Sequence, residues 1–484
     1  MKPDSETMSR VDTAWLRMDN DVNLMMIVGV WLLEPGVRYE HLCERVAERL
    51  LKYPRFAQRV VEDVTGARWV TDEQFDIHNH VIRHRLRRKR GQSARAALQN
   101  FAGELTMTPL DRDKPLWQFH LIERYDGGSA LVARIHHCIG DGIALISVLL
   151  SITDDGKDPP QRPPREKHVD DGDGDWLSDS VLKPLTEVAV RAIDATGGGV
   201  AKTLERIADP AASLGTVELA KIAYQAVSDV AALALMPDDS PTRLKGKPVG
   251  KKRVAWGEPL ALDAVKAVSK ALNCSINDVL LSCVAGAIGS YLREQGDNCD
   301  GQDFRAMVPV NLRPMSQAWQ LGNRFGLVPL LLPIGETHPV RRLLVVRQRM
   351  LELKGSYQPL LAFAVLALAG LLIKPAQEAL LGLFAKKASA VMTNVPGPTT
   401  PLKFCGSTLR QIMVWVPQSG DIGVGVSVLS YGGGVQFGLI TDEALCPDPQ
   451  AIIDRFEPEF DQLLWVTLMM PWGDAEEAAE TAAA

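Results

Sequence analysis

The chain has 484 residues, a net charge of −6 and a pI near 5.9. This length suffices for two domains with substantial cores, and the acidity excludes a protein that binds nucleic acid through bulk positive charge. The seven cysteines have no paired spacing, which favours reduced thiols in the cytoplasm over a disulfide framework. The polar N-terminus lacks the apolar core of a signal peptide.

The first elements are an apolar strand and an amphipathic helix. Residues 23–33 are almost continuously apolar, as in a strand buried on both faces. Residues 38–51 place apolar side chains on one helical face, and residues 69–81 are expected to form a loop and a short strand. A basic run at residues 83–90 follows, and it is either a solvated surface or a contact for anionic lipid head groups or CoA phosphates.

A predicted β-hairpin follows, and two histidines lie at the end of its second strand. Residues 117–123 and 130–136 have strand character and flank the turn Asp126-Gly127-Gly128. His136 and His137 end the second strand, and an apolar helix is expected at residues 143–150. Strand ends beside helix N-termini are where α/β sheets carry chemistry on loops.

His137 is a candidate general base, because a neutral imidazole accepts a proton near its ordinary pKa of about 6.5. Neighbouring strand residues point to opposite faces, so one of His136 and His137 is expected to be structural. Asp141 can orient a ring, cap the helix or pair with a distant arginine, and Gly142 leaves room for a substrate.

This stretch has three other interpretations. Two core histidines beside a capping aspartate would explain His136 and His137 on their own. A metal site is disfavoured, because adjacent histidines diverge on a strand and the chain has no CxxC or HExxH partner motif. Cys138 as a nucleophile is also disfavoured, and we expect it to be a small buried residue.

A polar segment divides the chain. Residues 154–175 are rich in Pro, Asp and Gly and predict a linker, and residues 176–236 predict bridging helices. The following Gly/Lys-rich loop ends in Lys251, Lys252 and Arg253, which are candidates for binding CoA phosphates. The loop lacks the P-loop pattern, and a solvated basic loop is the alternative.

The second half again alternates strands and helices. Strands are expected at residues 254–256, 304–310, 327–332, 389–395, 409–416, 423–431 and 434–441, and helices at 263–272, 276–291 and 449–468. Ser275 and Asp278 resemble a capping box, so Asn277 has a structural alternative as a helix-start residue. Residues 359–373 are uncharged but too short to span a membrane, and with residues 379–384 they favour a peripheral membrane contact over a buried core helix.

Several motifs in order identify a resemblance that covers about residues 9–472. His136 to Gly142 match the HHxxxDG motif of the CoA-dependent acyltransferase superfamily. Other stretches resemble its bacterial wax ester synthase/diacylglycerol acyltransferase family: Asp12 with Ala14-Trp15-Leu16, Pro115-Leu116-Trp117, Asn277-Asp278, Asn323-Arg324-Phe325 and Thr393-Asn394-Val395-Pro396-Gly397-Pro398.

The resemblance implies an α/β (α+β) fold of two chloramphenicol-acetyltransferase-like subdomains, with mixed sheets flanked by helices and His137 in a tunnel between them. The expected divisions are residues 1–153 for the N-terminal subdomain, 154–240 for the linker and bridging helices, 241–473 for the C-terminal subdomain and 474–484 for a tail.

It also implies O-acyl transfer from a long-chain acyl-CoA to a long-chain alcohol or diacylglycerol, with His137 as general base and no acyl-enzyme. Asn277 would help to hold the oxyanion, and Arg313 would pair with Asp141; His136 and Gly142 complete the candidate site. No metal and no cofactor besides the co-substrate acyl-CoA is expected, and the expected location is the cytoplasmic face of a membrane or a lipid droplet. The alternatives are a different hydroxyl acceptor and a non-catalytic lipid-binding protein.

Overall fold

A long hairpin forms the centre of the N-terminal sheet. In the computed structural model, which describes residues 5–63, 66–156, 236–313, 320–353 and 386–470, β6 (Trp117–Tyr125) and β7 (Gly128–His136) pair antiparallel. The turn between them uses positive φ at Asp126 (46°) and Gly127 (81°). All nine residues of β7 are buried, so the predicted hairpin and its buried second strand are confirmed.

The six strands of this sheet follow the order β13-β14-β2-β7-β6-β5. Its other members are β2 (Met26–Glu34), β5 (Val81–His84), β13 (Lys403–Phe404) and β14 (Ser407–Trp415). Side chains of α1 (Arg10–Arg17), α2 (Tyr39–Arg49) and α4 (Gly142–Ser151) share a hydrophobic cluster with one face of the sheet. Side chains of α3 (Ala94–Thr106) pack on the opposite face.

A small sheet and three short turns of 3-10 helix complete the N-terminal half. The small sheet has the order β1 (Ser5–Thr7), β4 (Gly66–Thr71) and β3 (Gln58–Asp63). The 3-10 turns are Leu50–Lys52, Pro54–Ala57 and Ile77–Asn79.

The C-terminal sheet has seven strands in the described residues. Its path is β11-β10-β12-β15-β16-β8, with β9 also paired to β16, and the pairs β10–β12 and β12–β15 are parallel. Its strands are β8 (Lys252–Trp256), β9 (Leu260–Ala261), β10 (Phe304–Asn311), β11 (Phe325–Leu332), β12 (Ala390–Pro396), β15 (Val424–Tyr431) and β16 (Gly434–Asp442).

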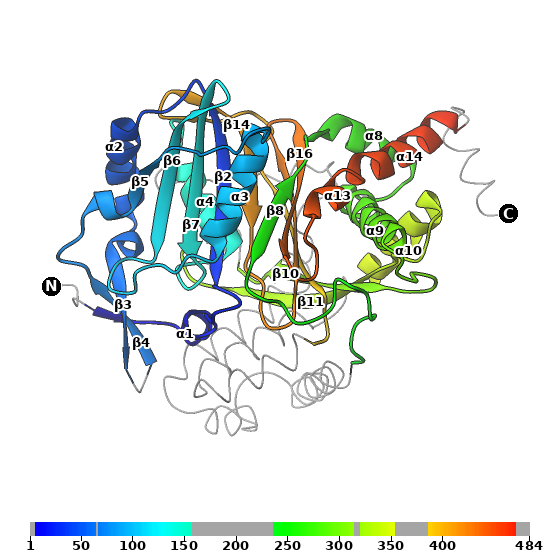
Figure 1. The fold of residues 1–484 in the computed structure, drawn as a ribbon, viewed down its shortest axis with the longest axis horizontal. Coiled ribbons are helices and arrows are strands. Elements are labelled where there is room, and N and C mark those ends of the chain that lie inside the picture. The colour runs from blue at the N-terminus through cyan, green and yellow to red at the C-terminus, as the bar shows by residue number, and fades with distance from the viewer. Residues whose placement is uncertain (1–4, 64–65, 157–235, 314–319, 354–385, 471–484) are drawn as a thin grey trace, which may run out of the picture.

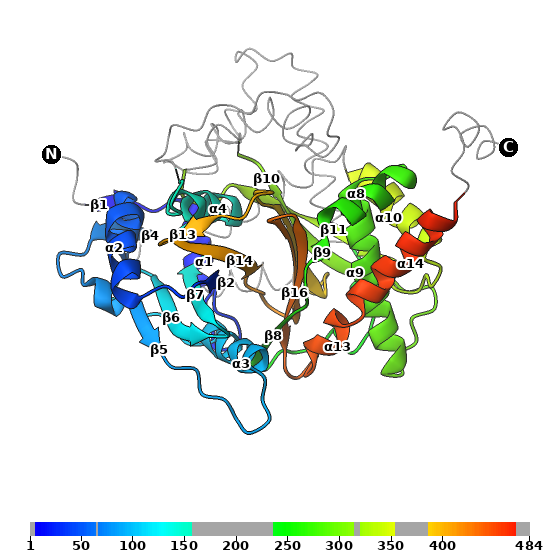
Figure 2. The same ribbon diagram turned by 90° about the horizontal axis from the view of Figure 1, so that it is seen from above.

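Helices cover the outer side of this sheet. They are α8 (Leu262–Ala271), α9 (Ile276–Glu294), α10 (Pro339–Leu353), α13 (Pro449–Ile453) and α14 (Phe456–Met469), and Figure 2 shows α9, α10 and α14 on that side. The single closing helix predicted at residues 449–468 is instead two helices, because Asp454 and Arg455 interrupt the helix between α13 and α14. The fold class predicted from the sequence, mixed sheets flanked by helices, is confirmed.

The two halves share strands and side chains. β14 comes from the range assigned to the C-terminal subdomain, yet it pairs with β2 in the N-terminal sheet (Figure 1). Val254 and Trp256 of β8 pack in the same hydrophobic cluster as α3, and the rings of Trp256 and Trp415 lie 5.8 Å apart. The predicted division at residue 241 therefore does not separate the two sheets.

Several expectations fall outside the described residues. These are most of the linker and the bridging helices (157–235), both apolar stretches (359–373 and 379–384) and the tail (474–484). Within the described residues, no single helix has the length and apolarity needed to cross a membrane; only the pair α8 and α9, bent by 101°, meets that criterion jointly.

Candidate active site

The two histidines lie where β7 leaves the N-terminal sheet. His136 is the last residue of β7, and the backbone N–H of His137 donates to the carbonyl of Met25 (2.7 Å). Both side chains are almost fully buried, with 2% and 3% exposure. They face different surroundings, because the His136 ring contacts Asp19 whereas the His137 ring stacks on Trp15.

Aromatic rings hold the His137 imidazole in place. The indole of Trp15 lies parallel to it, with ring centroids 4.1 Å apart and an interplanar angle of 13°, and Phe325 of β11 packs at 5.6 Å. The His137 carbonyl accepts a hydrogen bond from Nδ2 of Asn323 (2.7 Å). The ring atom Nδ1 is buried, and no hydrogen bond to it is found in the described part of the chain.

Burial determines the protonation state of His137. Loss of hydration lowers the pKa of His137 to about 4, and this effect exceeds the opposing effects of Asp141, of its own carbonyl and of Asn323. The imidazole is therefore neutral at pH 7, which is the form that accepts a proton.

Asp141 joins three parts of the fold at one carboxylate. It is the N-cap of α4, where its Oδ1 accepts from the backbone N–H of Ala144 (2.9 Å). Its two oxygens also accept from the guanidinium of Arg313, at 3.1 and 3.0 Å, and the backbone N–H of Arg324 donates to Oδ2 (2.9 Å). The predicted pairing with Arg313 is confirmed, and the carboxylate caps the helix at the same time.

Gly142 borders open space. It is the first residue of α4, and a Cβ added to it would meet no atom within 4 Å. That a substrate occupies this space, as expected from the sequence, stays a prediction. The neighbouring Gly140 bridges to Gly322, so the chain around the histidines contacts the segment that leads into β11.

Sequence reasoning used Asp12, Trp15 and Asn323 only as markers of a family resemblance, and the structure gives each a contact. Oδ1 of Asp12 accepts from both the backbone N–H (3.0 Å) and Nδ2 (2.7 Å) of Asn323. Burial raises the pKa of Asp12, against the lowering effect of these hydrogen bonds. No signal in a single sequence shows that residues some 300 positions apart meet around His137.

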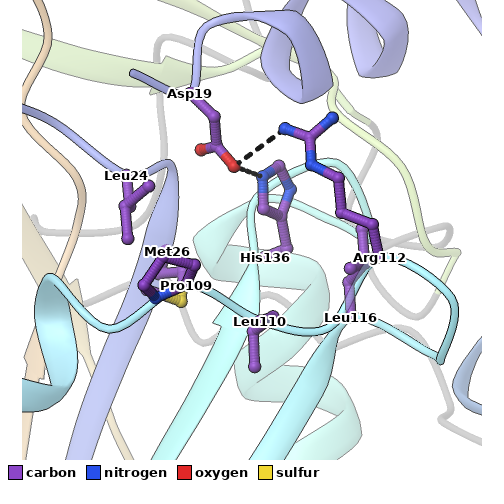
Figure 3. A pocket seen from close by; sticks show the side chains of 8 residues that line it. All are labelled: Asp19, Leu24, Met26, Pro109, Leu110, Arg112, Leu116 and His136. Atoms are coloured by element: carbon purple, nitrogen blue, oxygen red, sulfur yellow. Dashed lines mark hydrogen bonds and ion pairs between the residues drawn. The ribbon is translucent and has the colours of Figure 1, made fainter. Parts of the chain in front are cut away.

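His136 borders a small pocket (Figure 3). Nε2 of His136 lies 3.2 Å from Oδ2 of Asp19, and Nδ1 accepts from the backbone N–H of Cys138 (3.1 Å). The remaining lining residues are Leu24, Met26, Pro109, Leu110, Arg112 and Leu116. The sequence left open which of the two histidines is structural; His136 has a backbone donor at Nδ1 and a carboxylate near Nε2, which supports that role for His136.

Asn277 takes part in a different set of contacts. It is the second residue of α9, whose start has the predicted capping box of Ser275 and Asp278. The amide oxygen of Asn277 accepts from Nδ2 of Asn394 on β12, and within the described residues no hydrogen bond joins it to His137. Its capping neighbours support the structural alternative, and its role at an oxyanion stays a prediction.

The three basic residues predicted to bind CoA phosphates differ in burial and in their ion-pair partners. Lys251 is exposed. Lys252 is buried, and its Nζ contacts Oδ1 of Asn23 (2.9 Å) and Oδ2 of Asp442 (3.5 Å). Arg253 pairs with Glu443 (3.2 Å). The assignment of Lys252 to a phosphate is therefore corrected, because its ammonium is enclosed and already paired.

Cys138 is fully buried, as expected. Burial raises the pKa of its thiol well above the ordinary range, which disfavours the reactive thiolate. In the basic run, Arg83 pairs with Glu40 and Glu123, while the side chains at positions 85 and 87–90 are exposed and form no ion pair with the described residues.

The sequence matches the models of two protein-family domains. The wax ester synthase/diacylglycerol acyltransferase catalytic domain covers residues 8–280, and the WS/DGAT C-terminal domain covers residues 321–464. A probable diacylglycerol O-acyltransferase of Mycobacterium tuberculosis is 27% identical over 95% of this chain and 96% of its own. Wax ester synthase/diacylglycerol acyltransferase 7 of Arabidopsis thaliana is 24% identical over 88% of this chain and 90% of its own.

Solved structures share the fold. The wax ester synthase/diacylglycerol acyltransferase from Marinobacter aquaeolei VT8 superimposes with a TM-score of 0.63 at 21% identity, covering 96% of this chain and 100% of that one. The first condensation domain of the calcium-dependent antibiotic synthetase gives 0.58 at 14% identity, covering 96% and 97%. The chain belongs to the wax ester synthase/diacylglycerol acyltransferase family, and it is an acyltransferase.

Proposed function

We propose that this enzyme transfers a long-chain acyl group from acyl-CoA to a hydroxyl group, with His137 as the general base. One observation carries the proposal: the imidazole of His137, five residues before α4, is buried, held against Trp15 and neutral at pH 7. Binding a lipid requires no neutral base in this position, so the site favours an enzyme over a non-catalytic lipid-binding protein.

In this reaction a single residue, His137, acts first as general base and then as general acid. Nε2 of His137 takes the proton of the hydroxyl while its oxygen attacks the thioester carbonyl, and the resulting imidazolium protonates the departing CoA thiolate. General-base catalysis of this kind contributes about 10²–10⁴-fold to the rate. The oxyanion requires hydrogen-bond donors, and the side-chain amide of Asn277 and backbone N–H groups are the candidates in this chain. The mechanism forms no acyl-enzyme.

The acceptor is a long-chain alcohol, which gives a wax ester, or diacylglycerol, which gives triacylglycerol. The names of the relatives contain both activities. Lys251 and the exposed basic residues at positions 85 and 87–90 have no ion-pair partner in the described structure, which supports contacts with CoA phosphates or an anionic lipid surface. The protein would then work at the cytoplasmic face of a membrane or on a lipid droplet.

The test supplies the purified protein with palmitoyl-CoA and either hexadecanol or a diacylglycerol, and follows thiol release and ester product together. We expect one ester for each thiol released, and the ratio of the two products gives the acceptor preference. Thiol release without ester would indicate hydrolysis and contradict transfer to these hydroxyls. Neither product, in protein shown to be folded, would favour another acceptor or the lipid-binding alternative.

A further inference from the structure

Asp19 lies beside His136, in the segment between α1 and β2. Its side chain is 16% exposed, and Oδ2 lies 3.2 Å from Nε2 of His136 and 3.3 Å from the guanidinium of Arg112 (Figure 3). Oδ1 accepts from the backbone N–H of Met25 (2.6 Å). The carboxylate is therefore held at both oxygens, and neither His136 nor Asp19 has a role in the reaction described above.

The contacts of His136 define its tautomer. The backbone N–H of Cys138 donates to Nδ1 (3.1 Å), so Nδ1 must carry a lone pair rather than a proton. The proton of the neutral ring is then on Nε2, the atom that faces the carboxylate of Asp19. A carboxylate opposite one nitrogen and a backbone N–H opposite the other fix both the tautomer and the rotation of an imidazole.

Two routes connect Asp19 to His137. The first runs through the His136 ring to the backbone of Cys138, which flanks His137 on its C-terminal side. The second runs through Met25, whose N–H donates to Asp19 and whose carbonyl accepts from the N–H of His137 (2.7 Å). Residues on both sides of His137, and its own peptide, are thus tied to one carboxylate.

We propose that Asp19 is a positioning residue for acyl transfer: by fixing the Nε2–H tautomer of His136 and the Met25 peptide, it sets the place of the His137 imidazole. This inference rests on the proposed role of His137 as base. Asp19 acts through other residues, so its loss should lower kcat and leave the KM values for acyl-CoA and alcohol unchanged. A displacement of about 1 Å in a reacting group costs about a hundredfold in rate, and we expect a fall of about ten- to a hundredfold.

The experiment compares Asp19→Asn with Asp21→Asn in the full-length enzyme. Asparagine keeps an acceptor for the Met25 N–H, but its NH₂ group can oppose the Nε2–H of His136. Asp21 is on the same segment, is exposed, and its carboxylate has no partner within the described residues, which makes it the matched control. We expect a lower kcat only for Asp19→Asn, with unchanged KM values and an unchanged unfolding midpoint.

A double-mutant cycle with His136→Ala tests the route through the ring. If Asp19 acts on His137 mainly through His136, adding Asp19→Asn to His136→Ala should change kcat by less than about threefold, because coupled residues are not additive. Full additivity would contradict the route through His136. Wild-type kcat in Asp19→Asn would overturn the whole inference, provided that His137→Ala is inactive; an active His137→Ala would instead overturn the proposed base.

A second readout needs no change at Asp19. ¹⁵N spectra of the histidine rings in the wild-type protein distinguish the two neutral tautomers, and the His136 signals are identified by their loss in His136→Gln. We expect the Nε2–H tautomer. An Nδ1–H tautomer, or a doubly protonated ring at pH 7, would overturn the inference even if Asp19→Asn fails to fold.

Discussion

Replacing Asp141 with alanine should destabilise the protein strongly, because one carboxylate serves three groups. The substitution removes the N-cap of α4, which is worth about 1 kcal/mol. It also leaves Arg313, whose side chain has 0% exposure, without its counter-ion, and breaking a buried ion pair on one side costs about 3–5 kcal/mol. We therefore expect a loss of about 4–6 kcal/mol, a large share of the roughly 5–15 kcal/mol that stabilises a typical protein.

The assay is urea unfolding followed by tryptophan fluorescence, with two further variants. Asp141→Asn keeps an oxygen for the N–H of Ala144 but loses the charge, so its destabilisation should be intermediate. Asp263→Ala is the matched control, because Asp263 is also near a helix start but its side chain is 96% exposed and pairs with Lys266 only at 3.6 Å. If Asp141→Ala unfolds within about 1 kcal/mol of the wild type, the buried pair does not carry the stability assigned to it.

Four further predictions concern the pH dependence of activity and of stability, the space at Gly142 and the binding of CoA. Because burial lowers the pKa of His137 to about 4, kcat/KM should stay level from pH 7 down to about 5.5 and fall only near pH 4, and an acid limb near 6.5 would contradict this. In the unfolded chain the pKa of His137 returns to its ordinary value of about 6.5. The free energy of unfolding should therefore fall as the pH is lowered from about 6.5 to about 4, because the unfolded chain binds a proton that the folded protein does not. His137→Phe should reduce this dependence of the free energy of unfolding on pH. Gly142→Ala should have the same unfolding midpoint as the wild type, because its Cβ meets no atom within 4 Å. Gly142→Phe should lower kcat/KM, because its ring fills the open space. An unchanged kcat/KM in Gly142→Phe would contradict a substrate position there. Lys251→Ala should raise the KM for acyl-CoA at unchanged stability, while Lys252→Met should lower the unfolding midpoint at unchanged KM; the reverse pattern would restore Lys252 as the phosphate ligand.

Local sequence patterns predicted the elements that carry the site. Apolar periodicity placed β2, β7 and α9 to within a few residues, and the spacing of Ser275 and Asp278 predicted the capping box. These features depend on residues that are neighbours in the chain, so a single sequence contains them. The family resemblance supplied the pairing of Asp141 with Arg313, which joins residues far apart in the chain.

Contacts between distant segments were not predictable in this way. Nothing local indicates that β14 joins the N-terminal sheet, that Trp15 stacks on His137, or that Asp19 faces His136. Lys252 is different, because a signal existed. In a strand, side chains alternate between faces, so Lys252 shares a face with Val254 and Trp256, which pack in a hydrophobic cluster between the sheets. The sequence prediction treated Lys251, Lys252 and Arg253 as the end of a Gly/Lys-rich loop, and the alternation of a strand was therefore not applied to Lys252.

The rate of ester formation by His137→Gln tests the central claim most directly. The variant is compared with the wild type at saturating palmitoyl-CoA and acceptor, after its unfolding midpoint has been shown to match. The account predicts a fall in kcat of about 10²–10⁴-fold with little change in KM, because the variant lacks only the base. A rate within about tenfold of the wild type would contradict His137 as the group that takes the proton from the hydroxyl.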